Sequence, residues 1–328
     1  MQHLPVLKYS SRKLLKLLSL LIAVAIFSFV MLALSPIDPV DAYIGADMML
    51  VSPEQRELIA ERWGLNDPPV ERFLAWGEQV LQGNLGTSLI YNRPVIEVIG
   101  TRFIASLWLM LTAWMLSGIL GFTLGVLAGA YPDSLLDRAI RFYAYTLASS
   151  PAFWVGMLLL VIFSVSLRLT PICCGAPPGV DPADVTFIQR LHHIILPALT
   201  LSIVGIPGIA LHTRQELIEV LNSDYVLFAR AQGESTIGAV WQHGIRNIAL
   251  PAITLQFASL SELFGGAVLA EQVFTYSGLG EATVQAGLRG DVPLLLGIVL
   301  FSAVFVFVGN TIADLLYKVV DPRIKIGE

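Results

Sequence analysis

Residues 222–251 read NSDYVLFARAQGESTIGAVWQHGIRNIALP, the longest polar interruption between hydrophobic runs in the second half of the chain. This stretch predicts a rigid polar elbow of two short helices with a sharp break between them. Ser223 or Asp224 can cap the first helix, and Gly233 suits the left-handed residue that ends it. Ser235 or the threonine after it can cap the second helix. The apolar residues of that second helix recur at helical spacing: Ile237, Val240, Trp241, Ile245 and Ile248.

The composition around this elbow is that of a membrane protein. The chain has 328 residues, of which 55% are hydrophobic and 14% charged, and its mean hydropathy is +0.72, far from soluble usage. A net charge of -5 and a pI of about 5.6 argue against nucleic acid as a partner. The two cysteines are adjacent, so they predict no disulfide framework and leave the redox compartment open.

Six apolar runs predict an all-α, polytopic membrane protein with six transmembrane helices. The first, Leu17–Leu34, follows four basic residues and is longer than the apolar core of a signal peptide, which favours an uncleaved first helix. The other five runs are Phe103–Ala130, Phe142–Leu167, Ile194–Leu211, Pro251–Ala270 and Val292–Ala313. Each approaches or exceeds the roughly 20 residues that cross about 30 Å of hydrocarbon.

Basic residues predict the orientation of these helices. Six crossings place both termini on one side. The short loops of the other side hold only Arg168, Arg190 and Arg289, whereas lysines and arginines gather in both tails and in the loops that share their side. Because basic residues concentrate in cytoplasmic loops, we expect both termini to be cytoplasmic, N-in and C-in.

The predicted spans divide the chain into five parts. These are a cytoplasmic tail (1–16), a first transmembrane helix (17–35), an outer periplasmic or extracellular segment (36–102), a core of five transmembrane helices that includes the cytoplasmic elbow at 222–250 (103–321), and a cytoplasmic tail (322–328). In the outer segment, a helix capped by Ser52 should run through Trp63 and end at Gly64, and a second should cover Val70–Leu81 before a turn at Gly83–Gly86. We interpret this segment as a packed cap on the helix ends, with contact to a delivered substrate or its carrier as the alternative.

Small residues and prolines mark the core spans. Glycines recur every three or four residues in the run 103–130 and permit close helix approach: Gly118, Gly121, Gly125 and Gly129. Pro151 lies inside the next predicted span, where it should kink or break the helix. Pro197 and Pro207 should bend the span after that. Bent helices suit a transport pathway, with Pro151, Phe153 and Trp154 as candidates, although proline is common in membrane helices.

The chain lacks the motifs of catalysis. No Gly-Lys pair occurs, so there is no phosphate-binding loop and we expect no ATP hydrolysis by this chain. The zinc motif His-Glu-x-x-His and the nucleophile elbow Gly-x-Ser-x-Gly are also missing, which argues against a membrane enzyme. Cys173-Cys174 and His192-His193 carry ligand atoms for nickel, copper or zinc, but nothing fixes their geometry, so we expect no metal site and no cofactor.

Two acidic residues lie in or near the fifth apolar run. Glu262 is inside it, where an ionised side chain costs about 2.5–3.5 kcal/mol on insertion scales. It should line a pathway or be a buried, hydrogen-bonded or protonated carboxyl, unless the span is placed at the wrong depth. Glu271 follows the run and is expected at the outer interface.

Several motifs together resemble the peptide/nickel family of ABC-importer permeases over nearly the whole chain. The elbow contributes Asp224-Tyr225-Val226, Ala229-Arg230-Ala231-x-Gly233 and Arg246-Asn247-x-x-Leu250-Pro251. Further matches are Asn84-Leu85-Gly86-Thr87-Ser88, Ser150-Pro151-x-Phe153-Trp154, His193 to Ala198, Gly265-Gly266-Ala267, Glu271-x-Val273-Phe274, Ser277 to Gly280 and Asp321 to Ile324. Gln232, Glu234 and Tyr276-Ser277 depart from the usual residues and leave the substrate subgroup open.

The resemblance implies a type I ABC-importer permease fold and a set of partners. These are a second homologous permease, two ABC ATPase subunits that use ATP and magnesium, an extracytoplasmic substrate-binding protein and membrane lipid. The elbow would be the family's "EAA" loop, whose short coupling helix docks in an ATPase cleft. The residues implied in that contact are Asp224, Tyr225, Ala229, Arg230, Ala231, Gly233 and Glu234.

The predicted function is that of a permease subunit for ATP-driven import of di- or oligopeptides across a bacterial or archaeal inner or plasma membrane. Nickel or a metal chelate is the alternative cargo. A stand-alone channel or an ion-coupled carrier is the alternative class. The substrate pathway is expected to include Glu262, Pro151, Phe153 and Trp154.

Overall fold

The structure, a computed structural model, describes residues 3–34, 39–44, 51–62, 66–177, 179–180 and 185–320. Over these residues the chain is helical, with a single isolated β-bridge between Thr87 and Pro94. The predicted helix end at Trp63 and Gly64 lies outside the described residues. The motif at 321–324 and the tail 322–328 lie outside them as well.

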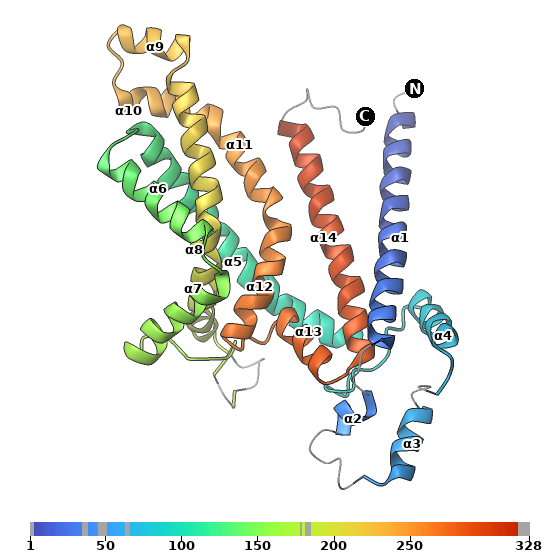
Figure 1. The fold of residues 1–328 in the computed structure, drawn as a ribbon. Helices are drawn as coiled ribbons and strands as arrows, with labels where there is room; N and C mark the ends of the chain where they lie inside the picture. Colours follow the sequence, from blue (N-terminus) through green and yellow to red (C-terminus); the bar gives the residue numbers. More distant parts are fainter. Residues whose placement is uncertain are drawn as a thin grey trace. The chain divides into compact units, whose positions relative to one another are not determined.

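Figure 1 shows the helices in chain order. They are α1 (His3–Ala33), α2 (Pro39–Ile44), α3 (Pro53–Arg62), α4 (Pro69–Leu81), α5 (Val95–Ala130), α6 (Leu135–Ala148), α7 (Ala152–Leu159), the π-helical η2 (Leu160–Ser166), α8 (Phe187–Leu221), α9 (Asp224–Ala231), α10 (Thr236–Ala239), the π-helical η3 (Val240–Gly244), α11 (Ile245–Ala258), α12 (Leu260–Val273), α13 (Leu279–Leu288) and α14 (Val292–Val320).

The chain forms two compact units. The first comprises Met1–Ile104 and Leu279–Val308, and the second comprises Ala105–Gly278 and Gly309–Glu328. Helices α1 to α4 and α13 belong to the first unit, whereas α6 to α12 belong to the second. Both α5 and α14 contribute residues to each unit. The elbow therefore lies in the second unit.

Four single helices are long and apolar enough to cross a membrane in the part of the chain that the structure describes. They cover Ser11–Ala33, Val95–Ala130, Phe187–Leu221 and Val292–Leu315. Two bent pairs also pass this test: Leu135–Ala148 with Ala152–Ser166, bent by 109°, and Thr236–Ala258 with Leu260–Val273, bent by 50°. The structure is therefore that of a polytopic helical membrane protein.

The bends only partly follow the prolines. Pro151 stands at the 109° bend, where α6 has ended and the extended Pro151 (φ -63°, ψ 132°) begins α7. Proline causes this break because it has no N–H to donate and disfavours helix in the residue before it. Pro251 instead lies inside α11, which starts at Ile245, and the 50° bend comes at Ser259. The prediction that a span begins at Pro251 is wrong, because the helix runs through the proline.

In the first unit, a buried set of hydrogen bonds joins the start of α14 to the 84–94 turn. Asp291 is fully buried and stands at the start of α14, where its Oδ1 accepts the Leu294 N–H at 3.1 Å. Its Oδ2 accepts the buried Ser88 hydroxyl at 2.6 Å and the Ile90 N–H at 3.0 Å. One carboxylate thus caps α14 and fastens the 84–94 turn, whose Gly86 has a φ of +86°.

In the second unit, α5 packs closely against α8 along three glycines, Gly121, Gly125 and Gly129, which we call the glycine seam. A Cβ at Gly121 would lie 2.9 Å from Ile209 Cβ, and one at Gly125 would lie 2.6 Å from Thr213 Cβ. Further along, a Cβ at Gly129 would lie 3.0 Å from the carbonyl oxygen of residue 214. The predicted close approach is confirmed, since no larger residue fits between these two backbones.

Glu271 is buried, with 1% of its surface exposed, and its Oε1 accepts the Ser106 hydroxyl at 2.5 Å. The turn after α12 folds back over Glu271, and its expected position at the outer membrane interface stays a prediction. In that turn the Tyr276 N–H donates to the Glu271 carbonyl oxygen at 2.8 Å, and the Tyr276 hydroxyl donates to the Ala105 carbonyl oxygen at 3.2 Å. Burial raises the pKa of Tyr276 to about 12, so this phenol keeps the proton that it donates.

Candidate functional site

The elbow forms two arms that meet at Gly233. Helix α9 ends at Ala231, and Gly233 takes a φ of +101°, a conformation that costs glycine least. Ser235 then caps α10, with its Oγ accepting the Gly238 N–H at 3.1 Å. The two short helices and the break between them are confirmed. The second arm, however, passes through η3 and runs into α11 without interruption.

A small apolar core holds both arms on the C-terminal end of α8. Its buried residues are Leu217, Leu221, Val226, Ala239, Val240 and Ile248. Val226 comes from the first arm and Ala239 from the second, and both are fully buried. A Cβ at Gly244 would lie 2.6 Å from Leu217 Cδ1, so the second arm needs a glycine to pack here. The elbow is therefore fastened to α8 from two directions.

Polar contacts link the two arms. His243 Nε2 lies 3.2 Å from Glu234 Oε2. Asn247 Nδ2 donates to the Tyr225 hydroxyl at 3.3 Å and to the His243 carbonyl oxygen at 2.7 Å. The Tyr225 and His243 rings meet edge to face, with centroids 5.8 Å apart. These contacts hold the residues around the break in one arrangement.

Both arms of the elbow expose large apolar side chains. Phe228, Ile237 and Trp241 expose 65%, 61% and 69% of their surfaces. Of the apolar series that recurs at helical spacing, Val240 and Ile248 are buried, whereas Ile237 and Trp241 are exposed. The π-helical turn η3 (Val240–Gly244) interrupts the regular helical spacing within this series.

The predicted coupling residues belong to the first arm and to the break between the two arms. Asp224, Tyr225, Arg230, Ala231 and Gly233 are exposed, and Ala229 is half-buried. Glu234 is half-buried because it turns back to His243. Arg230 also borders a cavity of about 560 Å³, whose wall includes Tyr131, Asp133, Asn222 and Thr236.

An ion pair that sequence reasoning missed fixes α6 to α8 beside the elbow. Asp137 is fully buried. Arg214 donates two hydrogen bonds to its carboxylate, from Nε to Oδ1 at 2.6 Å and from Nη2 to Oδ2 at 2.8 Å. Arg141 Nη2 lies 3.3 Å from Asp137 Oδ2, and the Asp133 N–H donates to the same oxygen at 2.8 Å. The signal in the sequence was an acid and a base at the ends of consecutive spans.

The predicted pathway residues lie apart from the elbow along the chain. Pro151, Phe153 and Trp154 are exposed at the start of α7, which packs its Gly156 against Thr200 of α8. Glu262 is exposed in the first turn of α12. This chain alone therefore does not bury Glu262, and its predicted place on a pathway stays a prediction.

Cys173 and Cys174 form a disulfide with each other, a pairing that the sequence did not predict. Cys174 in this turn has a φ of +74°. Over the described residues, no group of three or more His, Cys, Asp and Glu side chains is placed to hold a metal ion.

Comparison with known proteins identifies the family. Residues 121–326 match the model of the binding-protein-dependent transport system inner membrane component. The oligopeptide transport system permease protein AppB of Bacillus subtilis is 36% identical over 97% of this chain and 99% of its own. The glutathione transport system permease protein GsiC of Salmonella choleraesuis is 34% identical over 97% and 99%, and the di/tripeptide transport system permease protein DppB of Pseudomonas aeruginosa is 32% identical over 97% and 99%.

A solved structure of the MetNI methionine ABC transporter, in inward-facing conformations, shares 16% identity and a TM-score of 0.48 over 67% of this chain and 97% of that chain. The score is too low to bear on the fold. The family match covers more than half of the chain, and the three permeases are at least 32% identical over nearly all of it. The chain therefore belongs to the family of binding-protein-dependent transport system inner membrane components, the integral membrane permeases of such transporters.

Proposed function

We propose that this chain is the permease subunit of an ATP-driven importer of di- or oligopeptides, and that its elbow couples it to an ATPase subunit. The relatives named as oligopeptide, glutathione and di/tripeptide permeases support a peptide cargo. The coupling role rests on one observation. The elbow is anchored by a buried core on α8 while it exposes Phe228, Ile237 and Trp241 to a partner.

Such a surface suits a docking role. Exposed apolar side chains gathered on one face mark protein interfaces, whereas scattered ones need no explanation. The elbow also carries the coupling residues of the family resemblance: Asp224, Tyr225, Ala229, Arg230, Ala231, Gly233 and Glu234. A rigid connection from the elbow to α8 would pass on the motion of an ATPase, and two arrangements of the helices would open a path to alternate sides.

The proposed assembly follows the family. Each bent helix pair counts as one crossing, which makes six, with both termini and the elbow in the cytoplasm. A second homologous permease, two ATPases that bind ATP and magnesium, and an outer substrate-binding protein complete the transporter. The path would lie against the exposed residues Glu262, Pro151, Phe153 and Trp154. A green fluorescent protein fused to the C-terminus should fluoresce in cells, and a dark but fully expressed fusion would contradict a cytoplasmic C-terminus.

Substitutions at the break test the coupling role. Gly233→Pro cannot keep a φ of +101°, since proline fixes φ near -65°, and it also removes the N–H that donates to the Arg230 carbonyl oxygen at 3.0 Å. Ala231→Asp puts a charge on the elbow. Both variants should insert into the membrane but lose peptide uptake and peptide-stimulated ATP hydrolysis.

Ala75→Asp is the matched control, because Ala75 is an exposed helical alanine outside the elbow. It should transport normally. Wild-type uptake by the elbow variants, at equal expression, would contradict the coupling assignment.

The cargo is tested with the substrate-binding protein and the reconstituted transporter. Labelled di- and tripeptides should bind and enter, and unlabelled peptide but not nickel should compete. Competition by nickel at micromolar concentration would favour the metal alternative. Uptake that persists after ATP depletion would favour a channel or an ion-coupled carrier.

A further inference from the structure

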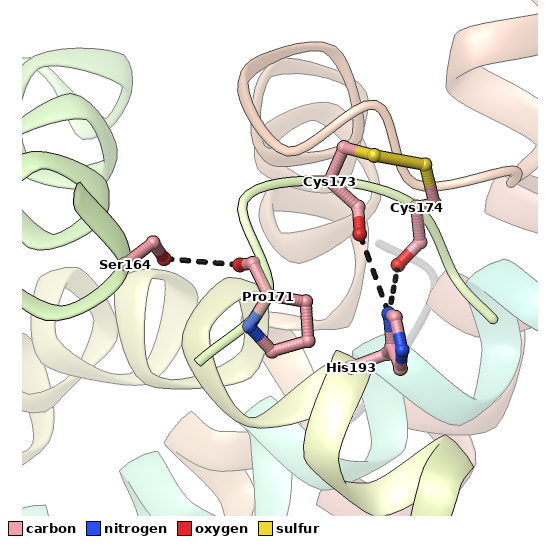
Figure 2. Close-up of a disulfide and its surroundings, with 5 residues drawn as sticks. All are labelled: Ser164, Pro171, Cys173, Cys174 and His193. Carbon is pink, nitrogen blue, oxygen red and sulfur yellow. Dashed lines mark hydrogen bonds between the residues drawn. A yellow bond between two sulfur atoms is a disulfide. The ribbon is translucent and has the colours of Figure 1, made fainter. Parts of the chain in front are cut away.

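The turn around Cys173 and Cys174 is held from three sides, all within the second unit. Figure 2 shows the disulfide above His193 of α8, whose Nδ1 lies 2.8 Å from the Cys174 carbonyl oxygen and 3.3 Å from that of Cys173. On the other side of the turn, the Ser164 hydroxyl of η2 donates to the Pro171 carbonyl oxygen at 2.9 Å. The Cys174 N–H donates to the Phe274 carbonyl oxygen, just after α12, at 3.0 Å.

The chemistry of these contacts fixes the role of His193. Carbonyl oxygens only accept hydrogen bonds, so Nδ1 must carry a hydrogen and donate to both. A ring nitrogen shared by two adjacent carbonyls holds both peptide groups of the cysteine pair in one orientation. His193 is therefore a positioning residue for the turn. The next residue of the turn is held too, since a Cβ at Gly175 would lie 3.2 Å from the Tyr276 ring.

The disulfide supplies the remaining constraint. It closes a small ring through the peptide group that joins the two residues, and Cys174 stays at a φ of +74°. L-residues other than glycine seldom occupy this region. Once the ring opens, Cys174 can relax to a negative φ. That change would turn its N–H away from Phe274 and its carbonyl away from His193.

Both cysteines are half-buried and neither is fully enclosed by the chain. A thiolate attacks one sulfur, forms a mixed disulfide and releases the other cysteine as a thiol. The second thiol of the same reagent then displaces the remaining cysteine. The dithiol reagent becomes a disulfide, and the two cysteines accept two electrons and two protons.

We propose that the Cys173–Cys174 bond is a thiol-reversible modification site that latches the 171–175 turn onto α8 and the end of α12, and that opening it by a dithiol slows transport. The effect on transport rests on the proposed function, because the latched elements belong to the predicted transport core. The bond itself is independent of that function. On the proposed orientation the turn faces the outer compartment, where disulfides persist.

The bond is tested by counting thiols in the full chain purified with its partners. The chain has only two cysteines, so a maleimide added under denaturing conditions reports on this pair alone. Intact mass should show no adduct on the untreated protein and two after dithiothreitol. Two adducts without reductant would overturn the proposal.

The effect on transport is tested in the reconstituted complex. Dithiothreitol should lower peptide uptake by about 2- to 30-fold, the range expected when a coupling contact is lost. The double variant Cys173→Ser, Cys174→Ser should show the same low uptake and no response to reductant. Unchanged uptake in both cases would overturn the latch. Failure of the untreated complex to take up any peptide would instead count against the proposed function.

Two variants separate positioning from folding. His193→Phe should keep the disulfide but speed its reduction several-fold, because the turn loses its donor. Ile172→Ala changes an exposed residue of the same turn and should leave both the reduction rate and uptake as in the wild type. Equal reduction rates for His193→Phe and the wild type would remove His193 from the latch.

Discussion

The two ends of α8 are fastened by different chemistry. Near its C-terminal end, Arg214 forms a two-pronged ion pair with the fully buried Asp137 of α6. At its N-terminal end, His193 donates to two backbone carbonyls of a turn that a covalent bond already closes. The first fastening depends on charge and the second on oxidation state. The same helix can therefore be loosened at one end without a change at the other.

The largest effect is expected when the ion pair near the C-terminal end of α8 is broken. Arg214→Met leaves the buried Asp137 carboxylate with the longer contact to Arg141 and the Asp133 N–H, and should destabilise the protein by about 3–5 kcal/mol. Thermal unfolding in detergent, followed by size-exclusion chromatography, measures the loss. Asp137→Asn combined with Arg214→Met should recover most of it, because no buried charge is left unpaired. Equal melting temperatures for Arg214→Met and the wild type would show that the pair is dispensable.

Packing near the charged end gives the next effect. Gly125→Ala would put a Cβ 2.6 Å from Thr213 Cβ and 2.7 Å from the Ala210 carbonyl oxygen, and should cost about 1–3 kcal/mol through overpacking. Gly100→Ala in the same helix is the control, because nothing lies within 4 Å of its added Cβ. If both alanine variants have the melting temperature of the wild type, the glycine seam contributes nothing to stability beyond the ion pair.

A smaller effect on stability is expected at the N-terminal end of α8, where His193 contacts the turn. His193→Phe removes one shared hydrogen bond and should lower stability by about 1 kcal/mol. His192→Phe is the control, since the His192 ring is exposed and contacts only the Leu169 carbonyl oxygen, at 3.0 Å, among the hydrogen bonds described. A loss as large as that of Arg214→Met would mean that the two ends do not differ in strength.

The smallest effect concerns the elbow beyond the charged end. His243 and Glu234 are both half-buried, and pairs near the surface contribute only about 0–1 kcal/mol. Glu234→Ala should therefore scarcely move the melting temperature in high salt. Gln242→Ala, an exposed neighbour of His243, is the control. A fall of several degrees in melting temperature that does not depend on salt would show that this contact stabilises the protein as strongly as the buried pair of Asp137 and Arg214.

Local signals in the sequence predicted the shape of the elbow. A glycine at the break and serines that can cap helices act over three or four residues, so Gly233 and Ser235 were identifiable without tertiary knowledge. The same local signals did not predict η3, because the apolar spacing was read at 3.6 residues per turn and a π-helical turn departs from it.

The contacts that hold the two ends of α8 could not be predicted from the sequence, for a different reason. Asp137 and Arg214 are 77 positions apart, and His193 lies 19 positions from the Cys174 carbonyl it contacts. Only the packing of the helices brings such groups together. Composition and the long apolar runs were sufficient for a helical membrane protein, and the motifs were sufficient for the family.

The glycine seam also limits how this chain can change in length. Each added residue turns a helix by about 100° and lengthens it by about 1.5 Å. One residue inserted between Gly121 and Gly125 would rotate the later glycines away from α8 and bring bulkier neighbours, such as Leu120 and Leu127, toward its backbone. Insertions and deletions between homologues should therefore collect in the connections around residues 82–94 and 167–186, whereas the seam should keep its length.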